Sequence, residues 1–238
     1  MKRREIEIKL RLKDEAEQGR MMVQLRELGF QLEYSRMELD YSVDTEGYRC
    51  RAKGLIVRLR RVDEGGHRRI ILTFKRKCKN ANFVDAEESE MILGEPSRQV
   101  WDYVNRVLKQ EVGLALPDGI LGGHDFVSVV EQLFQNGFSY FRILLEKRRS
   151  QLRRGDVVAT LDELPNGIGR FMELEAHNES QLKGLMKELG LSDNEMLNMD
   201  YGDLIMEYNG AKDLAGRTAV FDEEVKRAVY RLVGFAAG

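Results

Sequence analysis

The chain has 238 residues, of which 42% are hydrophobic, so it can bury a sizeable core as one large domain or two small ones. Charged residues make up 33% of it, yet the formal net charge is only −2, which disfavours a dedicated nucleic-acid binder because such a protein carries a clear basic excess. No apolar run approaches the ~20 residues that span a bilayer, and the first residues lead into charged sequence, so we expect a cytoplasmic protein.

The sequence opens with a strict alternation of charged and aliphatic residues from Glu5 to Leu12. Period-two alternation is typical of a strand with two unlike faces, and it places Glu5, Glu7 and Lys9 on one face. Strand residues two apart lie about 6.5 Å from each other, a distance at which two glutamates can hold one hard cation. A solvated edge strand could carry the same charges, but the pattern recurs several times downstream.

The remaining elements follow in chain order. A helix is predicted over 14–29, and then four strands over 32–43, 55–62, 69–77 and 84–93. Pro96 opens a further helix over 97–112, and the glycine-rich segment 116–123 predicts a loop or linker. After it we expect a helix over 126–136, strands over 138–152, 157–164 and 170–176, and helices over 179–190, 198–209 and 222–235. The total is about eight strands with helices outside.

One face of nearly every predicted strand is ionic. The same-face pairs are Arg58 with Arg60, Lys75 with Lys77, Glu88 with Glu90, Lys147 with Arg149, and Glu173 with Glu175, while Asp162 stands alone beside Thr160. A closed eight-stranded barrel accommodates this pattern, because the aliphatic face can pack outward against helices while the charged face lines a water-filled interior. Lys77 falls where its strand ends, so its side chain is either in that interior or solvated.

Enclosed like charges are costly unless they are compensated. We therefore expect a polyanion for the basic residues and a divalent metal for the carboxylates. A carboxylate set without His or Cys fits Mg²⁺ or Mn²⁺, and Cys50 and Cys78 lie outside any spacing typical of a zinc site. Several cations together with a metal are what phosphoryl chemistry uses, since Lys and Arg neutralise phosphate oxygens and the metal bridges them.

These residues resemble the CYTH superfamily, also called triphosphate tunnel metalloenzymes, which includes class IV adenylyl cyclases, thiamine triphosphatases and inorganic triphosphatases. Glu5-x-Glu7-x-Lys9 matches the ExExK signature of the family. The later elements fall in the family's order: Arg58 and Arg60, Thr73 and Lys75, Glu88 and Glu90, Lys147 and Arg149, Asp162 ahead of Gly167-x-Gly169, and Glu173 with Glu175. The match spans residues 3 to 208.

The resemblance implies an α+β fold in which a closed antiparallel eight-stranded β-barrel forms a tunnel with helices packed outside. This domain would occupy residues 1–210, with a helical insertion near 95–124, and a C-terminal helical extension would follow over 211–238. Catalysis would fall to Glu5, Glu7 and Lys9. The triphosphate would be bound by Lys9, Arg58, Arg60, Lys75, Lys77, Lys147 and Arg149. Mg²⁺ or Mn²⁺ would be held by Glu5, Glu7, Glu88, Glu90, Asp162, Glu173 and Glu175.

The function this favours is metal-dependent hydrolysis of a triphosphate compound, whether inorganic tripolyphosphate, thiamine triphosphate or a nucleoside triphosphate. One alternative is a class IV adenylyl cyclase, although family cyclases carry a basic residue before a Ser-Tyr pair where this chain has Met199-Asp200-Tyr201-Gly202. Another is a noncatalytic triphosphate- or polyphosphate-binding module. Paired carboxylates would repel a nucleic-acid backbone, and the oligomeric state stays open, with a homodimer as one option.

Overall fold

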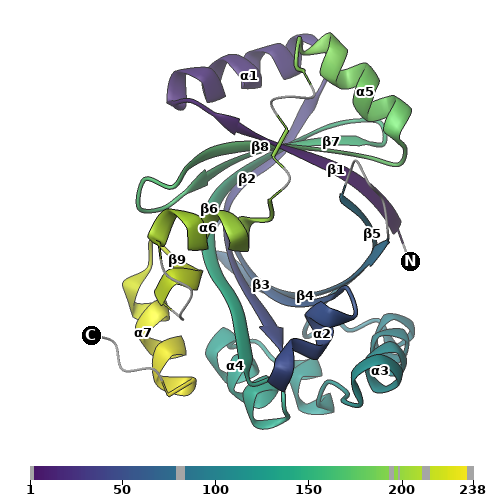
Figure 1. Cartoon of the computed structure of the whole chain (residues 1–238), viewed down its shortest axis with the longest axis vertical. Coiled ribbons are helices and arrows are strands. Elements are labelled where there is room, and N and C mark those ends of the chain that lie inside the picture. The colour runs from purple at the N-terminus through teal and green to yellow at the C-terminus, as the bar shows by residue number, and fades with distance from the viewer. Residues whose placement is uncertain (1–2, 79–83, 193–195, 198, 211–214, 235–238) are drawn as a thin grey trace.

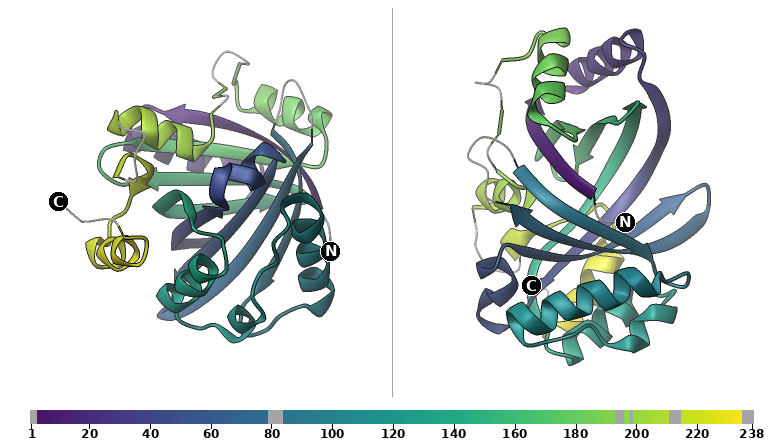
Figure 2. Two further views of the ribbon diagram at one scale, coloured as in Figure 1. Left: turned by 60° about the horizontal axis from the view of Figure 1, so that its bottom comes forward. Right: turned by 90° about the vertical axis from the view of Figure 1, so that its right-hand side faces the viewer.

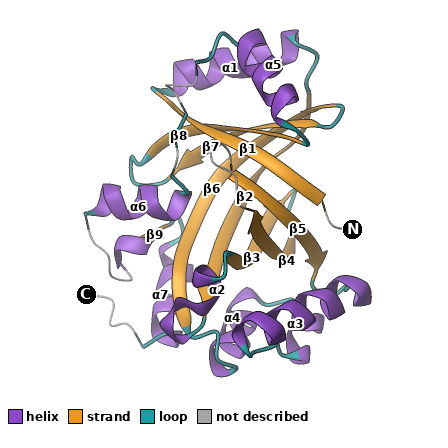
Figure 3. Ribbon diagram, turned by 45° about the vertical axis from the view of Figure 1, so that its right-hand side comes forward, coloured by secondary structure: helices purple, strands orange, loops and turns teal. Residues whose placement is uncertain are grey.

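The computed structural model describes residues 3–78, 84–192, 196–197, 199–210 and 215–234, and for residues 3–5, 78, 84–85, 141 and 215 it describes the backbone only. Over this part of the chain the fold is α+β (Figure 1). A curled antiparallel sheet of eight long strands lies between helices, as Figure 3 shows by secondary structure. No helix in the described residues combines the length and apolar character that a membrane crossing needs.

The eight long strands are β1 (Arg3–Leu12), β2 (Gln31–Asp44), β3 (Leu55–Glu64), β4 (His67–Cys78), β5 (Val84–Ile92), β6 (Tyr140–Arg154), β7 (Val157–Leu164) and β8 (Gly169–Ala176). They run in the order β2-β3-β4-β5-β1-β8-β7-β6, and β2 also pairs with β6, so the order returns to its first member. A two-residue strand, β9 (Thr218–Ala219), adds to β6 in parallel. The sheet thus brings residues from both halves of the chain around one concave face.

Two helical layers cover the outer face of the sheet, one on either side of the molecule (Figure 2). The first consists of α1 (Glu15–Glu27) and α5 (Glu179–Glu188), and the second of α3 (Arg98–Val112) and α4 (Phe126–Gln135). Nearer the C-terminus lie α6 (Tyr201–Asn209) and α7 (Glu223–Leu232). Each of these helices begins at a side-chain cap, for example Ser97 before α3 and Asp222 before α7, which satisfies otherwise unpaired backbone donors.

Aliphatic residues alternate along the strands and form the core outside the sheet. Val57 and Leu59 of β3 pack with Trp101 of α3 and Val129 of α4 in one cluster. Ile6, Ile8 and Leu10 of β1 pack in a second cluster that includes residues of α1 and α5. Because the other strand face must then point inward, the charged residues of the alternation share the concave side.

The predicted elements coincide with the observed ones, apart from their ends and four omissions; the predicted helix ends at residues 198 and 235 lie outside the described residues. The sequence did not predict the 3₁₀ turn η1 (Glu46–Tyr48), the one-turn helix α2 (Arg49–Ala52), the 3₁₀ turn η4 (Ala215–Arg217) or β9. The predicted linker over 116–123 is a packed segment instead: Ile120 is fully buried, and the indole of Trp101 donates a hydrogen bond to Asp118 in the 3₁₀ turn η2 (Asp118–Gly122). Whether 1–210 and 211–238 are separate units stays a prediction.

Candidate functional site

The concave face of the sheet encloses a cavity of about 690 Å³. Its lining carries twelve Lys and Arg side chains and eight Asp and Glu side chains. Among the residues predicted from the sequence, those that line the cavity are Glu7, Lys9, Arg58, Arg60, Lys75, Lys77, Glu88, Glu90, Lys147, Arg149, Glu173 and Glu175. Glu5 lies in β1 opposite Ala86, but its side chain is outside the described part of the structure. Asp162 is fully buried and is not among the residues that line the cavity.

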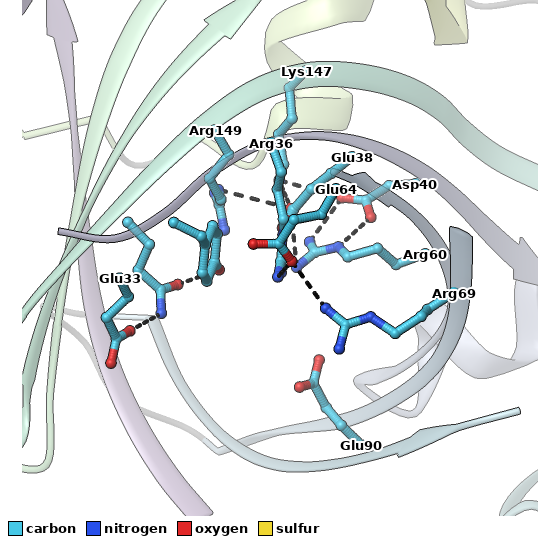
Figure 4. A network of polar contacts seen from close by, with 12 residues as sticks. Glu33, Arg36, Glu38, Asp40, Arg60, Glu64, Arg69, Glu90, Lys147 and Arg149 are labelled. Atoms are coloured by element: carbon cyan, nitrogen blue, oxygen red, sulfur yellow. Dashed lines mark hydrogen bonds and ion pairs between the residues drawn. The ribbon is translucent and has the colours of Figure 1, made fainter. Parts of the chain in front are cut away.

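The centre of the cavity is an ion-pair network around two buried carboxylates of β2, Glu38 and Asp40 (Figure 4). The guanidinium of Arg60 donates two hydrogen bonds to Asp40, at 2.6 and 2.9 Å, and the ammonium of Lys147 lies 3.3 Å from the same carboxylate. Arg60 also lies 3.2 Å from Glu38. These carboxylates therefore hold the cations of β3 and β6 in one place without a bound ligand.

Protonation in this network follows from burial and pairing. Burial alone would raise the pKa of Asp40, but Arg60 and Lys147 outweigh it and hold that pKa well below its usual range. Burial likewise opposes ionisation of Glu38, whose pKa falls to about 2 because Arg60, Arg149 and Lys147 face it. Burial and the neighbouring Arg149 lower the pKa of Lys147. Both carboxylates are therefore charged at neutral pH, which keeps the surrounding cations in position.

A second anchor fixes Arg149 of β6. Its guanidinium donates hydrogen bonds to both oxygens of Asp162, at 2.7 and 2.5 Å, and one to Glu173 at 2.6 Å. The hydroxyl of Tyr201 donates to Asp162 at 2.6 Å. In this arrangement both oxygens of Asp162 contact Arg149, and Asp162 does not line the cavity; its role as a metal ligand stays a prediction.

Lys9 joins the predicted signature strand to α6. Its ammonium lies 3.2 Å from Glu173, 3.4 Å from the carbonyl oxygen of Met199 and 3.8 Å from the ring centroid of Tyr201. Burial alone would raise the pKa of Glu173. The cations of Lys9 and Arg149 outweigh burial, so the pKa is lowered. Lys9 is thus a cation held between a carboxylate and an aromatic face, which positions it for a ligand that enters the cavity.

Among the candidate metal ligands, two carboxylates are the least neutralised by neighbouring cations. Glu7 of β1 lies directly opposite Glu175 of β8 in the register of the sheet. Burial raises the pKa of Glu175 to about 7; Lys75 opposes this rise, and the charges of Glu7 and Glu173 add to it. Like charges that repel in a buried place favour a cation between them. No cluster of three or more His, Cys, Asp or Glu suited to a metal occurs among the described residues.

This pair still fits a hard divalent cation. Mg²⁺ is commonly held by one or two carboxylates, with phosphate oxygens of the substrate and water completing its shell. Glu7 and Glu175 supply two oxygen ligands of that kind. Glu88, by contrast, lies 3.1 Å from Lys75 and 3.6 Å from Arg58, and Glu90 accepts a hydrogen bond from Thr73 at 2.9 Å. The structure brings Glu88 and Glu90 into salt-bridge contacts, while their role as metal ligands stays a prediction.

Sequence reasoning missed the charged face of β2 and the part played by Tyr201. The strand was predicted, but the same-face series Arg36, Glu38 and Asp40 was not used as a signal, although it alternates as clearly as the first strand. In the sequence Tyr201 stands out only as part of the segment Met199-Asp200-Tyr201-Gly202, and nothing there assigns it a contact. Its contacts with Asp162 and Lys9 depend on α6 reaching back over β1 and β7, which no local pattern indicates.

Comparison with known proteins adds to this geometry. A family model described as CYTH domain matches residues 3–199. The structure of the PH1819 protein from Pyrococcus horikoshii OT3 is similar with a TM-score of 0.61 and 20% identity, covering 86% of this chain and 99% of that one. A conserved hypothetical protein from Pyrococcus furiosus gives 0.58 and 18%, covering 83% and 97%. A candidate adenylate cyclase from Vibrio parahaemolyticus gives 0.51 and 17%, covering 85% and 97%. These likenesses show a shared fold. No curated protein sequence matches the chain.

Proposed function

The chain belongs to the CYTH domain family, and on that premise we propose that it hydrolyses a triphosphate compound with the help of Mg²⁺ or Mn²⁺ inside a charged β-tunnel. Members of this family are typically triphosphatases or adenylyl cyclases. Closure of the sheet into a tunnel is part of the proposal, and the pairing of β2 with β6 supports it.

The observation that carries the proposal is the meeting of two charge sets in one cavity. Lys9, Arg58, Arg60, Lys75, Lys147 and Arg149 come from four strands and line the same space as Glu7 and Glu175. Such a set is expensive to enclose unless a polyanion and a cation use it. A linear triphosphate with its metal supplies both.

The basic residues would bind and orient the phosphates. Arg60 and Arg149 are held by Asp40 and Asp162 through paired hydrogen bonds, so their forks are fixed before a ligand arrives, and less ordering entropy is lost on binding. Arg58 is less constrained: its guanidinium has carboxylates only at 3.6 Å or more, and its buried Nε has no hydrogen-bond partner among the described residues. This guanidinium can therefore turn towards a phosphate oxygen with little loss of existing contacts.

The carboxylates Glu7 and Glu175 would hold the metal, together with Glu5 of the signature strand as the family resemblance implies. When bound, the metal would neutralise developing charge on the phosphate oxygens. The carboxylates would position the attacking water and accept its hydrogen bonds. The same cavity could serve a cyclase, but its lining segment Met199-Asp200-Tyr201 lacks the basic residue that family cyclases carry before their Ser-Tyr pair, so we favour hydrolysis.

The test is product analysis. Purified protein is incubated with tripolyphosphate, thiamine triphosphate and ATP in the presence of Mg²⁺ or Mn²⁺. We expect orthophosphate to be released. Formation of cyclic AMP and pyrophosphate would instead assign a cyclase, and metal-dependent binding without turnover would assign a noncatalytic module.

A matched pair of variants tests the metal assignment. Glu7→Gln should abolish turnover and leave the fold intact, because it removes one charge from the carboxylate pair with little change of shape. Glu27→Gln removes a charge from the exposed surface of α1 and should behave as wild type. Wild-type turnover in Glu7→Gln would show that the metal assignment is wrong.

A further inference from the structure

A second group of cations lines the cavity at a distance from the central network. We call it the mouth cluster: Arg51, Lys77 and Arg142, with Tyr48 and Arg217 beside them. It gathers residues from α2, the end of β4, the start of β6 and the segment after α6. The positive charges of Arg142 and Lys77 both act electrostatically on the carboxyl group of Asp200. The two cations therefore lie at the same end of the cavity.

The fold aims Arg142 into the cavity by an irregularity. Alternate residues of β6 from Ile143 onward line the cavity, so Arg142 would face outward in a regular strand. Ser42 of β2 pairs with Ile143, and Val43 pairs with Phe141, so Arg142 is the extra residue of a β-bulge. Bulges re-aim side chains and are common beside functional sites.

A buried carboxylate fixes the turn that carries Tyr48 and Arg51. Asp44, fully buried at the end of β2, accepts hydrogen bonds from the backbone N–H groups of Thr45, Cys50 and Arg51, at 2.7 to 2.9 Å. Tyr48 between them has a φ of 54°, a left-handed conformation that is unfavourable for a non-glycine residue. Backbone strain of this kind persists where the surrounding structure holds the residue in place, and it is common at functional sites.

The segment after α6 completes the mouth cluster. Arg217 donates a hydrogen bond to the hydroxyl of Tyr48 at 2.7 Å. The segment is anchored by Glu146, a buried carboxylate that accepts hydrogen bonds from the backbone N–H groups of Phe221 and Asp222, both at 2.7 Å. These residues lie beyond the stretch matched by the family model, which ends at residue 199. The mouth is therefore built partly by residues outside the stretch that the family model matches.

The two groups of cations differ in how they are compensated. In the central network Arg60, Lys147 and Arg149 each contact buried carboxylates. Among the described residues no direct ion pair is made by Arg51, Lys77 or Arg142, although the charges of Lys77 and Arg142 act on the Asp200 carboxyl group from further away. Cations that are not neutralised by direct ion pairs attract an anion.

We propose that the mouth cluster is a second anion subsite, which holds the distal phosphates of a linear inorganic polyphosphate longer than a triphosphate. The inference rests on the proposed function, since the proximal phosphates would lie in the central network. The five residues from Lys147 to Arg142 span up to about 16 Å of strand, more than the length of a triphosphate. A chain of phosphates bridges that distance with negative charge at every unit, whereas a nucleoside would bring an uncharged group to the mouth.

The experiment compares two probes, tripolyphosphate and a linear polyphosphate of about ten units, by calorimetric binding to the full chain without added metal. The readout is the ratio of their dissociation constants. We expect the longer chain to bind more tightly to the wild type. Arg142→Ala and Arg51→Ala should each reduce this preference about tenfold, because each removes a charge-assisted contact made only by the longer chain.

Two controls separate the outcomes. Arg60→Ala should weaken both probes by a similar factor and keep the ratio, and Lys187→Ala, which removes an exposed charge from α5, should change neither. A ratio unchanged in Arg142→Ala and Arg51→Ala, with thermal unfolding as in wild type, would overturn the inference. Loss of chain-length preference in these variants, in a protein that hydrolyses none of tripolyphosphate, thiamine triphosphate and ATP with metal, would support the subsite and refute the proposed hydrolysis.

Discussion

Replacing Asp40 with asparagine removes the negative charge at the centre of the network while keeping the shape of the side chain. Asp40 is only 4% exposed. Its carboxylate accepts two hydrogen bonds from Arg60, and Lys147 and Arg58 lie at 3.3 and 3.8 Å. The variant leaves these three cations around a neutral amide, whose N–H₂ group opposes one of the donors.

The expected cost is large because the remaining charges cannot be solvated. Removing one partner of a buried ion pair costs about 3–5 kcal/mol, so we expect Asp40→Asn to lower the free energy of unfolding by about 3 kcal/mol or more. For a chain of this size that corresponds to a fall in Tm of about 6–12 °C. The pKa of Asp40 is lowered in the folded state. Its contribution is therefore present above the unfolded pKa near 3.8 and is lost as pH falls towards the folded value.

Urea unfolding of the ligand-free protein at pH 7, followed by the fluorescence of the single Trp101, measures this cost. Asp63→Asn is the matched control, because Asp63 pairs with Arg61 and Arg68 at a partly exposed position and should lose only about 0–1 kcal/mol. Equal losses in the two variants would refute the reasoning that the central carboxylate stabilises the enclosed cations.

Three other outcomes follow from the site. Glu175 has a folded pKa of about 7, above its ordinary value of 4.5, so the metal-free protein should lose stability as pH rises between these values, and Glu175→Gln should remove that loss in thermal unfolding scans. Tyr201→Phe keeps the ring beside Lys9 but removes the hydrogen bond to Asp162; the free energy of unfolding should fall by about 1–2 kcal/mol, and no loss would show that the hydroxyl is equally well solvated. Arg60→Ala should weaken tripolyphosphate binding about tenfold or more, and unchanged affinity would remove it from the phosphate-binding set.

The sequence predicts the strands well because their alternation is a local property. Glu7 and Lys9, Arg58 and Arg60, and Lys147 and Arg149 each share a strand face by spacing alone, and the structure brings all three pairs to one cavity. For these pairs to meet, the aliphatic faces of the strands only had to be buried on the outside of the sheet. The family resemblance then supplied the order of the elements, and the family match confirms the family itself.

What the sequence could not predict depends on contacts between distant segments. Whether Asp162 faces the cavity or holds Arg149 is decided by Tyr201, 39 residues further along the chain. The raised pKa of Glu175 depends on burial and on the cross-strand position of Glu7. Arg142 enters the cavity through a bulge, which breaks the alternation that the prediction relied on. Each of these three features is a property of register and packing, which composition and period do not determine.

The central claim is that one enclosed space holds both a chain of phosphates and its metal. A crystal structure of the protein with tripolyphosphate and Mn²⁺, with the metal located by its anomalous signal, tests it directly. We predict phosphate oxygens in contact with Arg58, Arg60 and Lys147, and the manganese between Glu7 and Glu175. Phosphates bound on the outer surface, or manganese away from both glutamates, would contradict the account.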